Sequence, residues 1–436
     1  MNDWFYVEPT NTKIEGEIFL KGDKSITHRL IIFSSLAKGK TVIFNPLKSE
    51  DTLATLNIFK NLGVEIEVEK DKIKIKGRGK YGLIAPLKAL DCKESGTTIR
   101  ILAGLLSAQK FSSVLRAKKS LLNRPMKRVC EPLRLMGADI KGRVKDSEEF
   151  PPLKIKPVKY LKGIRYNLPV ASAQVKSALI LASLYAKGSC EITEPFKSRD
   201  HTERILSFLG ADIKIRGKKI IIKNSFFKTP KRFFIPADIS SASFFIALAL
   251  LKKDSHIKIK DVSLNPTRIG FLRILKRMGA KIKLSYKEKE PEPYGDIEVF
   301  YSKLKSTFIK EEEVPTLIDE LPLFMVVATQ AEGISYISSC KELKVKETDR
   351  LRSMTENLRK MGAKIWIEKK GNDYQVIIKG PTKLKGRILN SYSDHRTFLS
   401  LVVAANLAKS VSKISNKECV NKSFPEFFKI YKSFFS

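Results

Sequence analysis

The sequence predicts a mixed α/β fold in which six similar repeats are divided between two domains. Three features of the 436 residues favour this fold. A short motif, called here the glycine phrase, occurs five times and consists of the end of a helix, a glycine and a strand of alternating apolar and polar residues. An amphipathic helix precedes each glycine, and a second helix, which is more apolar, occurs in every repeat. The five phrases are LGVEIEV (62–68), MGADIKG (136–142), LGADIKI (209–215), MGAKIKL (278–284) and MGAKIWI (361–367). Their glycines are separated by 74, 73, 69 and 83 residues, close to one sixth of the chain.

The glycine and the residues after it define the strand part of each repeat. The position just after a helix often needs a left-handed backbone, which glycine adopts without strain. Alternating apolar residues such as Ile213 and Ile215 then indicate a half-buried strand, and a turn at Arg216-Gly217 extends it into a hairpin over 213–223. We therefore expect the repeats to end in a strand and often in a hairpin.

Two helices precede this strand part in each repeat. The helix before the glycine is amphipathic: in the fifth copy Leu351, Met354, Leu358 and Met361 stand at offsets 0, 3, 7 and 10, which places them on one face. The more apolar helices are expected near 25–38, 97–108, 172–187, 240–251, 320–331 and 395–408. Residues suited to N-capping stand at or near their starts, namely Ser25, Thr97, Ser172, Ser240-Ser241, Asp319 and Asp394.

The repeats divide most simply into two groups of three. Three of them start on each side of Pro236-Ala237-Asp238, and the last repeat lacks its glycine phrase. The strand KIEGEIFL (13–20) is expected to complete that last repeat. We therefore expect one domain built from residues 1–22 and 237–436, and an inserted domain of residues 23–236. A single six-repeat solenoid is the alternative, but the helices at its two ends are too apolar to serve as exposed caps.

The composition argues against several classes of protein. No apolar run reaches the roughly 18–20 residues of a membrane-spanning helix, and no secretory signal is visible, so we expect a cytoplasmic protein. Five scattered cysteines without a CxxC pair and four histidines without ligand spacing predict reduced thiols and no metal site. The net charge of +36 leaves a nucleic-acid-binding protein as a distant alternative. The lysines are spread along amphipathic segments, however, which favours solvated faces.

Unusual polar residues gather at the expected helix starts. A helix N-terminus offers unpaired N–H groups and a partial positive charge, so several starts directed at one place would bind phosphate and carboxylate groups. The segments concerned are GDKSITHR (22–29), SGTTIR (95–100), NRPM (123–126), SAQVKSA (172–178), KETDRL (346–351), DHR (394–396) and NKSFPEF (421–427). Each alone is explained as a capped surface helix or a turn, whereas their joint occurrence across the repeats favours a site for anions.

These segments, in this order, resemble the signatures of the 5-enolpyruvylshikimate-3-phosphate (EPSP) synthase family over nearly the whole chain. The resemblance implies two domains, each of three βαβαββ repeats around buried parallel helices (an inside-out α/β barrel), with a ligand cleft between them. It also implies transfer of the enolpyruvyl group of phosphoenolpyruvate to the 5-hydroxyl of shikimate 3-phosphate, a step toward the aromatic amino acids. A monomer that uses neither a metal nor an organic cofactor is expected.

The resemblance carries over site residues by position. Those expected at shikimate 3-phosphate are Lys24, Ser25, Arg29, Ser172, Gln174, Ser198, Arg199, Asp319 and Lys346. Those expected at phosphoenolpyruvate are Lys24, Gly96, Arg124, Gln174, Arg350, Arg396 and Lys422. Guanidinium groups suit bidentate recognition of carboxylate and phosphate, and lysines act as compact charges. Proton transfer is implied for Asp319, with help from Lys24, and for Glu347.

One residue departs from the family's pattern, and one related family is a rival. Glu94 stands beside Gly96 where relatives usually carry Asn, so its carboxylate either weakens binding of phosphoenolpyruvate or points away and caps its own helix. The rival is UDP-N-acetylglucosamine enolpyruvyl transferase. That family has Asn where this chain has Ser25, a reactive Cys where this chain has Lys119, and no KETDR segment.

Overall fold

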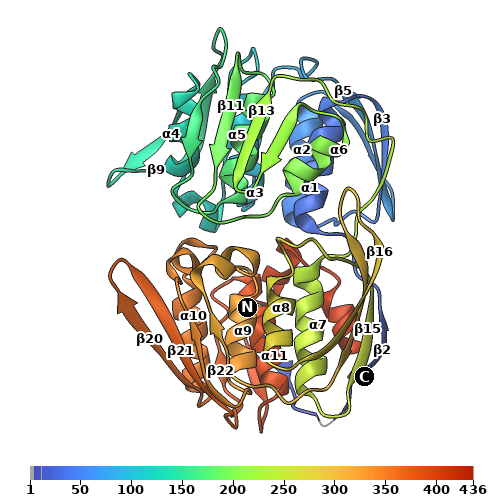
Figure 1. Cartoon of the computed structure of the whole chain (residues 1–436), viewed down its shortest axis with the longest axis vertical. Helices are drawn as coiled ribbons and strands as arrows, with labels where there is room; N and C mark the ends of the chain where they lie inside the picture. Colours follow the sequence, from blue (N-terminus) through green and yellow to red (C-terminus); the bar gives the residue numbers. More distant parts are fainter. Residues whose placement is uncertain (1–3, 11, 436) are drawn as a thin grey trace. The chain divides into compact units, whose positions relative to one another are not determined.

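The computed structural model describes residues 4–10 and 12–435. The chain divides into two compact domains. The terminal domain contains the residues up to Leu20, Ala237–Lys289 and Pro293–Ser436, and the inserted domain contains Lys21–Pro236 and Glu290–Glu292. Within the described residues, each domain combines three small sheets with helices (Figure 1). The predicted mixed α/β class is therefore confirmed.

The three sheets of the inserted domain share one pattern. In each, the first two strands are parallel, and the third and fourth are antiparallel to their neighbours. In spatial order the sheets are β14 (Arg232–Phe234), β3 (Lys38–Phe44), β5 (Lys72–Arg78) and β4 (Glu65–Val68); β6 (Leu90–Asp91), β7 (Ser113–Arg116), β9 (Glu148–Lys156) and β8 (Asp139–Lys145); and β10 (Arg165–Asn167), β11 (Ser189–Thr193), β13 (Lys219–Lys223) and β12 (Ile213–Arg216). The first sheet thus takes its opening strand, β14, from the end of the domain.

The terminal domain repeats the pattern in two sheets and shortens it in the third. The two full sheets are β2 (Glu15–Ile18), β15 (His256–Ser263), β17 (Tyr294–Phe300) and β16 (Lys281–Glu288); and β18 (Phe308–Ile309), β19 (Gly333–Ile337), β21 (Asp373–Gly380) and β20 (Lys364–Lys370). The third contains β22 (Ile388–Leu389), β23 (Ser412–Ile414) and β1 (Phe5–Val7), with β1 antiparallel to β23.

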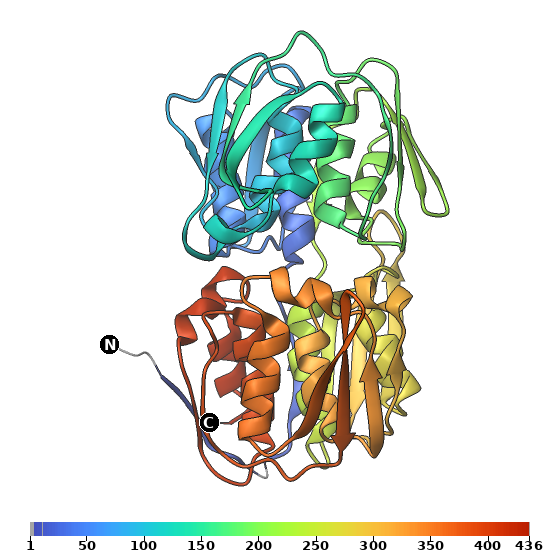
Figure 2. The ribbon, with the colours of Figure 1, turned by 90° about the vertical axis from the view of Figure 1, so that its left-hand side faces the viewer.

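The strand expected over 13–20 forms, as β2, but its predicted place in the last repeat is wrong. β2 runs parallel to β15, with Ile18 opposite Ile259, and so belongs to the sheet of the fourth repeat. The last sheet is completed instead by β1, whose Phe5 lies opposite Ile414; in Figure 2 this blue strand runs beside the red C-terminal elements. Alternating apolar residues indicate that a segment forms a strand. Which strand it pairs with is decided by contacts with residues far along the chain, and the local sequence pattern does not contain this information.

The six apolar helices form the interior of the two domains. They are α1 (Lys24–Leu36), α3 (Gly96–Leu106) and α5 (Ala173–Ser183) in the inserted domain, and α7 (Ile239–Leu251), α9 (Leu321–Ala328) and α11 (His395–Asn406) in the terminal domain. Every residue of α11, and every residue of α7 from Ile239 to Leu250, is buried. Such a helix is covered on all sides, which explains why it is apolar around its circumference.

The remaining helices are amphipathic or short. The α-helices are α2 (Glu50–Asn61), α4 (Lys127–Leu135), α6 (His201–Phe208), α8 (Gly270–Arg277), α10 (Arg350–Lys360) and α12 (Phe427–Lys432). The short 3-10 helices are η1 (Lys119–Asn123), η2 (Glu311–Thr316), η3 (Lys341–Val345) and η4 (Lys417–Lys422). In α8, Phe271 and Ile274 are buried while Arg273 and Lys276 are exposed, which is the periodicity expected of a helix with one solvated face.

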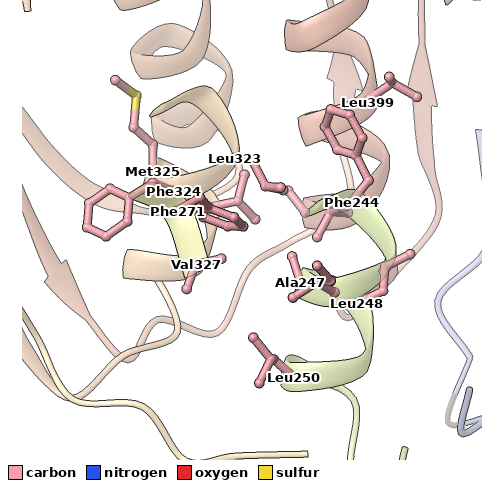
Figure 3. Packing of buried hydrophobic residues seen from close by; sticks show 14 of the residues in the cluster. Phe244, Ala247, Leu248, Leu250, Phe271, Leu323, Phe324, Met325, Val327 and Leu399 are labelled. Carbon is pink, nitrogen blue, oxygen red and sulfur yellow. The ribbon is translucent and has the colours of Figure 1, made fainter. Parts of the chain in front are cut away.

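The core of the terminal domain shows how the helix starts are held in place. α7, α9 and α11 lie side by side, and Phe244, Phe271, Leu323 and Leu399 belong to one buried cluster (Figure 3). Full burial of one such side chain stabilises the folded state by about 1.5–3 kcal/mol. This packing fixes the N-terminal ends of the three helices, where the polar residues lie.

The predicted helix ends agree with the backbone, but some predicted caps do not. Each glycine of the five phrases has a positive φ, namely Gly63 (85°), Gly137 (93°), Gly210 (82°), Gly279 (96°) and Gly362 (94°). Ser172 and Asp394 cap α5 and α11 as predicted. The helices α1, α3 and α7 each begin one residue earlier than expected, and their caps, Asp23, Ser95 and Asp238, lie two residues before the predicted Ser25, Thr97 and Ser240. Within residues 4–10 and 12–435, no helix is both long and apolar enough to span a bilayer.

Candidate active site

Hydrogen bonds join side chains at the starts of α3 and α5 of the inserted domain, and join the start of α1 to the segment before α6. The side chain of Gln174, on α5, donates to Thr97 Oγ1 over 3.0 Å and accepts from Arg100 Nη1 over 2.7 Å, both on α3. Nη1 of Arg199 donates to Ser25 Oγ, on α1, over 3.3 Å. Three of the expected residues, Ser25, Gln174 and Arg199, are therefore linked to neighbouring repeats through their side chains.

Gly96 is the first residue of α3, and two guanidinium groups lie against its open side. A Cβ at this position would stand 2.7 Å from Nη1 of Arg124 and 2.9 Å from Nη1 of Arg100. The missing side chain thus lets both cations approach the N-terminal turn of α3, where the helix dipole also favours an anion. Both arginines are buried, so an anion bound here would meet donors with little competing water.

Lys24 is the first residue of α1, and its ammonium group faces an acidic partner. Its Nζ lies 3.1 Å from Oδ2 of Asp51, on α2, and both side chains are largely buried. An anionic ligand beside Lys24 would therefore compete with Asp51 for the ammonium group. The charge of this lysine is held in place before any ligand arrives.

Arg29 and Ser198 are both buried and hydrogen-bonded to other residues of the inserted domain. The guanidinium group of Arg29 is fully buried and donates to Thr202 Oγ1 over 2.7 Å and to Ser177 Oγ over 2.8 Å. Burial lowers the pKa of Arg29 to about 10. Ser198 is likewise buried, and both its amide and its hydroxyl donate to Glu194 Oε1. These two residues are part of a protein-internal network.

Glu94 does not cap its helix, contrary to one of the two alternatives considered above. Ser95 caps α3, and the carboxylate of Glu94 instead accepts a hydrogen bond of 2.8 Å from Ser120 Oγ in η1. Nζ of the exposed Lys119 lies 3.6 Å from its other oxygen. Since η1 leads directly to Arg124, Glu94 helps to hold the turn that presents this arginine.

In the terminal domain, three carboxylates surround the guanidinium group of Arg350. Its Nε donates to Asp394 Oδ2 over 2.9 Å, its Nη1 to Asp319 Oδ1 over 3.2 Å, and its Nη2 to Glu347 Oε2 over 2.6 Å. Burial disfavours the charge of Arg350, but the three carboxylates, with Asp394 contributing most, outweigh it and raise the pKa. The arginine therefore stays charged and fixes all three acidic groups.

These carboxylates differ in their access to solvent. The side chain of Asp394 is 0% exposed, and its Oδ1 also caps α11 by accepting from the amides of Arg396 and Thr397. The side chains of Asp319 and Glu347 are 19% and 20% exposed. Asp319 is also not an N-cap, because α9 begins after Glu320. Asp319 and Glu347 are therefore the two acidic groups here that a bound molecule can reach.

A second buried network holds Arg396. Its Nη1 lies 3.7 Å from Glu320 Oε1, which also accepts a hydrogen bond from Ser240 Oγ. Arg268 Nη2 donates to the same hydroxyl over 2.9 Å and lies 3.5 Å from Asp238. Burial raises the pKa of Glu320 above its ordinary value, against the opposing effect of Arg396. The network ties the starts of α7, α9 and α11 together.

The two lysines of this domain lie beside the same groups. Burial lowers the pKa of Lys346, and the charge of Asp319 opposes this effect. Lys422 is buried at the end of η4, where its Nζ donates to the backbone oxygen of Ser393 over 3.3 Å. Since Ser393 precedes the cap of α11, Lys422 is connected to the segment that carries Arg396.

Sequence reasoning assigned no role to several residues of these networks, among them Arg100, Asp51 and Glu320. Arg100 had a usable signal, because it is a charged residue inside an otherwise apolar helix. Glu320 follows Asp319 directly and has the same character, since both precede an apolar helix. Asp51 had no signal that separates it from an ordinary acidic residue in the first turn of a helix.

The whole chain is similar to proteins of one named family. A family model described as EPSP synthase (3-phosphoshikimate 1-carboxyvinyltransferase) matches residues 9–430. The chain is 47% identical over 429 residues to the 3-phosphoshikimate 1-carboxyvinyltransferase of Petrotoga mobilis, which covers 98% of both chains. It is 46% identical over 426 residues to that of Thermodesulfovibrio yellowstonii, with 96% of both covered. The solved EPSP synthase of Acinetobacter baumannii superposes with a TM-score of 0.86 at 39% identity, over 99% of this chain and 98% of that one. The chain therefore belongs to the EPSP synthase (3-phosphoshikimate 1-carboxyvinyltransferase) family.

Proposed function

We propose that this protein transfers the enolpyruvyl group of phosphoenolpyruvate to the 5-hydroxyl of shikimate 3-phosphate and releases phosphate. The observation that carries the proposal is the family match over residues 9–430, on a chain in which the polar residues of the family's signature segments are present. The acidic pair Asp319 and Glu347, held on one guanidinium group yet partly exposed, supplies the groups that such a reaction needs. The product is a precursor of aromatic amino acids.

Recognition of shikimate 3-phosphate is assigned to residues of both domains. These are Lys24, Ser25, Arg29, Ser172, Gln174, Ser198, Arg199, Asp319 and Lys346. The cations among them match the phosphate and carboxylate of the substrate, and the hydroxyl and amide groups match its ring hydroxyls. The arrangement that we propose with this assignment is three repeats around buried helices in each domain, an inside-out α/β barrel.

Recognition of phosphoenolpyruvate is assigned to a set dominated by cations. These are Lys24, Gly96, Arg124, Gln174, Arg350, Arg396 and Lys422. The approach of Arg124 to the side-chain-free Gly96 favours an anion at the start of α3. Arg350 and Arg396 are each already paired with a carboxylate of the protein. A bound phosphoenolpyruvate would therefore share these two guanidinium groups with the protein's own carboxylates.

The reaction consists of an addition followed by an elimination. The 5-hydroxyl oxygen forms a bond to C2 of phosphoenolpyruvate while Asp319, helped by Lys24, accepts the hydroxyl proton. Glu347 supplies a proton to the methylene carbon, which becomes a methyl group. In the second half a proton returns from that methyl group to Glu347, the C2–O bond to phosphate breaks, and the double bond forms again. The departing phosphate takes up the hydroxyl proton that Asp319 holds, so both carboxyl groups return to their starting states and no redox step is needed.

The two alternatives are weaker. UDP-N-acetylglucosamine enolpyruvyl transferase shares the chemistry, but the matching family model and the relatives named above are those of the shikimate enzyme. A nucleic-acid-binding role rests only on the net charge of +36. Many of the lysines on strand faces are paired, such as Lys74 with Glu69 over 2.6 Å, which is expected of solvated sheet surfaces. A cytoplasmic monomer that needs no metal or organic cofactor remains our proposal.

A phosphate-release assay tests the proposal directly. The purified protein is incubated with phosphoenolpyruvate and either shikimate 3-phosphate or UDP-N-acetylglucosamine, and inorganic phosphate is measured. We expect release only with shikimate 3-phosphate. Release only with the UDP-sugar would assign the protein to the rival activity, and release with neither would contradict both.

Replacing Glu94 tests whether its charge matters to phosphoenolpyruvate. Since its carboxylate is engaged by Ser120 and Lys119, and Asn can still accept from Ser120, we expect Glu94→Asn to change the KM for phosphoenolpyruvate by less than about threefold. Glu94→Ala is the matched comparison: it removes the acceptor that holds η1, and we expect a larger rise in the same KM. A tenfold or greater fall in KM for Glu94→Asn, which is about 1.4 kcal/mol, would show instead that the charge repels the ligand.

A further inference from the structure

The segment between β11 and α6 carries Ser198 and Arg199, and the carboxylate of Glu194 is one of the groups that hold it in place. Glu194, at the start of this segment, accepts from both the amide and the hydroxyl of Ser198. The side chain of Arg199 in turn donates to Ser25 Oγ. The position of Ser198 therefore depends on what holds the carboxylate of Glu194.

That carboxylate is held by a lysine inside the domain. Nζ of Lys176, on α5, lies 2.8 Å from Glu194 Oε2 and 2.7 Å from Glu203 Oε1, on α6. Lys176 is 1% exposed, Glu194 4% and Glu203 2%. Among the residues that the structure describes, Glu203 Oε2 has no hydrogen-bond partner, so Lys176 is the main support of that side chain. We call Lys176, Glu194 and Glu203 the buried triad.

Arg29 balances the charge of the buried triad. The triad holds one ammonium group and two carboxylates, and the guanidinium group of Arg29 lies close enough to Glu203 for their charges to interact. Hydrogen bonds from Arg29 to Thr202 on α6 and Ser177 on α5 connect it to the same helices. Two cations and two anions are thus buried together, which is tolerated only because each has partners.

We propose that the buried triad sets the affinity for the phosphate end of shikimate 3-phosphate, because it fixes the segment of Ser198 and Arg199 against α5. The inference rests on the proposed function and deepens it. None of the three residues needs to touch the substrate, so they are positioning residues. Lys176 stands one turn into α5, whose first turn carries Gln174, and it therefore sets the segment's place relative to that turn.

The first test is the variant Lys176→Met, which keeps the length of the side chain and removes its charge. Without the ammonium group, Glu194 is no longer held to α5, and the segment of Ser198 and Arg199 becomes less ordered. Binding of the substrate phosphate must then order this segment, which lowers the net binding free energy. We expect KM for shikimate 3-phosphate to rise roughly ten- to hundredfold, with KM for phosphoenolpyruvate and kcat within about threefold of the parent. An unchanged KM for shikimate 3-phosphate would overturn the proposal.

Lys80 offers a matched control in the same domain. It is also 1% exposed, but its Nζ donates to Asn224 Oδ1 and to the backbone oxygens of Leu184 and Ser225, at the opposite end of α5. Lys80→Met therefore removes an equally buried ammonium group without touching the buried triad. We expect lower stability but an unchanged KM for shikimate 3-phosphate. A rise in this KM as large as that of Lys176→Met would show that any buried lysine of this domain has the effect.

A double variant separates positioning from stability. Lys176→Met with Glu203→Gln restores the balance of buried charge, since Arg29 and Glu194 remain, but leaves Glu194 without its lysine. We expect the double variant to have a higher free energy of unfolding than Lys176→Met, while its KM for shikimate 3-phosphate stays as high as that of Lys176→Met. Recovery of KM together with stability would mean that the buried triad is only structural. Absence of turnover in the unmodified protein would contradict the proposed function itself, a result distinct from both.

Discussion

Replacing Asp319 by Asn, or Glu347 by Gln, is expected to lower kcat by roughly 10²–10⁴-fold, the usual contribution of one general acid or base. Both substitutions keep the shape of the side chain and its ability to accept a hydrogen bond from Arg350. They remove the capacity to take up the proton of the 5-hydroxyl or to exchange one with the methylene carbon. Because both side chains are about one-fifth exposed, loss of the charge leaves no deeply buried group without a partner.

The measurement is steady-state phosphate release, with the unfolding midpoint as a check on the fold. Asp349→Asn is the matched control: its side chain caps α10 by accepting from the amide of Arg352, and Asn caps a helix about as well. It removes a carboxylate two residues from Glu347 and is expected to leave kcat within about twofold. If Asp319→Asn and Glu347→Gln both kept near-full turnover, the assignment of the acid–base pair would be wrong.

The fold was predictable where local chemistry decides the conformation. The positions after the amphipathic helices need a left-handed backbone, so glycines such as Gly210 and Gly362 marked the helix ends. Continuous apolarity marked helices such as α7 and α11, because only burial on all sides makes it tolerable. The partner of the strand at 13–20 was not predictable, since β2 and β1 lie in the same N-terminal segment and each could have completed the last sheet.

The candidate site was predictable in its residue types but not in its connections. Arginine and lysine at the helix starts stand out in the sequence, and hydrogen bonds or ion pairs join them within each domain. The sequence does not show which carboxylate meets which cation. Asp319 illustrates the limit: it stands where an N-cap is common, yet the helix begins after Glu320 and its carboxylate accepts from Arg350 instead. Such pairings depend on tertiary distances that no local pattern contains.

Replacing Arg350 by Met is expected to cost the protein about 3–5 kcal/mol of unfolding free energy, the usual loss when one partner of a buried ion pair is removed. The three carboxylates do not contribute equally to this loss. Asp319 and Glu347 are partly exposed and can take up water when the guanidinium group is gone. Asp394 is 0% exposed and cannot, so it is left as an uncompensated buried charge. Turnover is expected to fall as well, because Arg350 is assigned to phosphoenolpyruvate.

Two further variants identify the source of this loss in urea unfolding. Arg352→Met, on the same helix, removes an arginine whose side chain is 70% exposed and paired with Glu356, and is expected to cost less than about 1 kcal/mol. Adding Asp394→Asn to Arg350→Met removes the stranded charge, while the Asn oxygen can still cap α11, so the double variant is expected to be more stable than Arg350→Met alone. Equal stability of the single and double variants would mean that Asp394 is not the source, and the cost would then have to arise from lost packing of the arginine stem. Recovery of stability without recovery of turnover is the combined result expected, because the second substitution restores charge balance but returns no cation to the ligand.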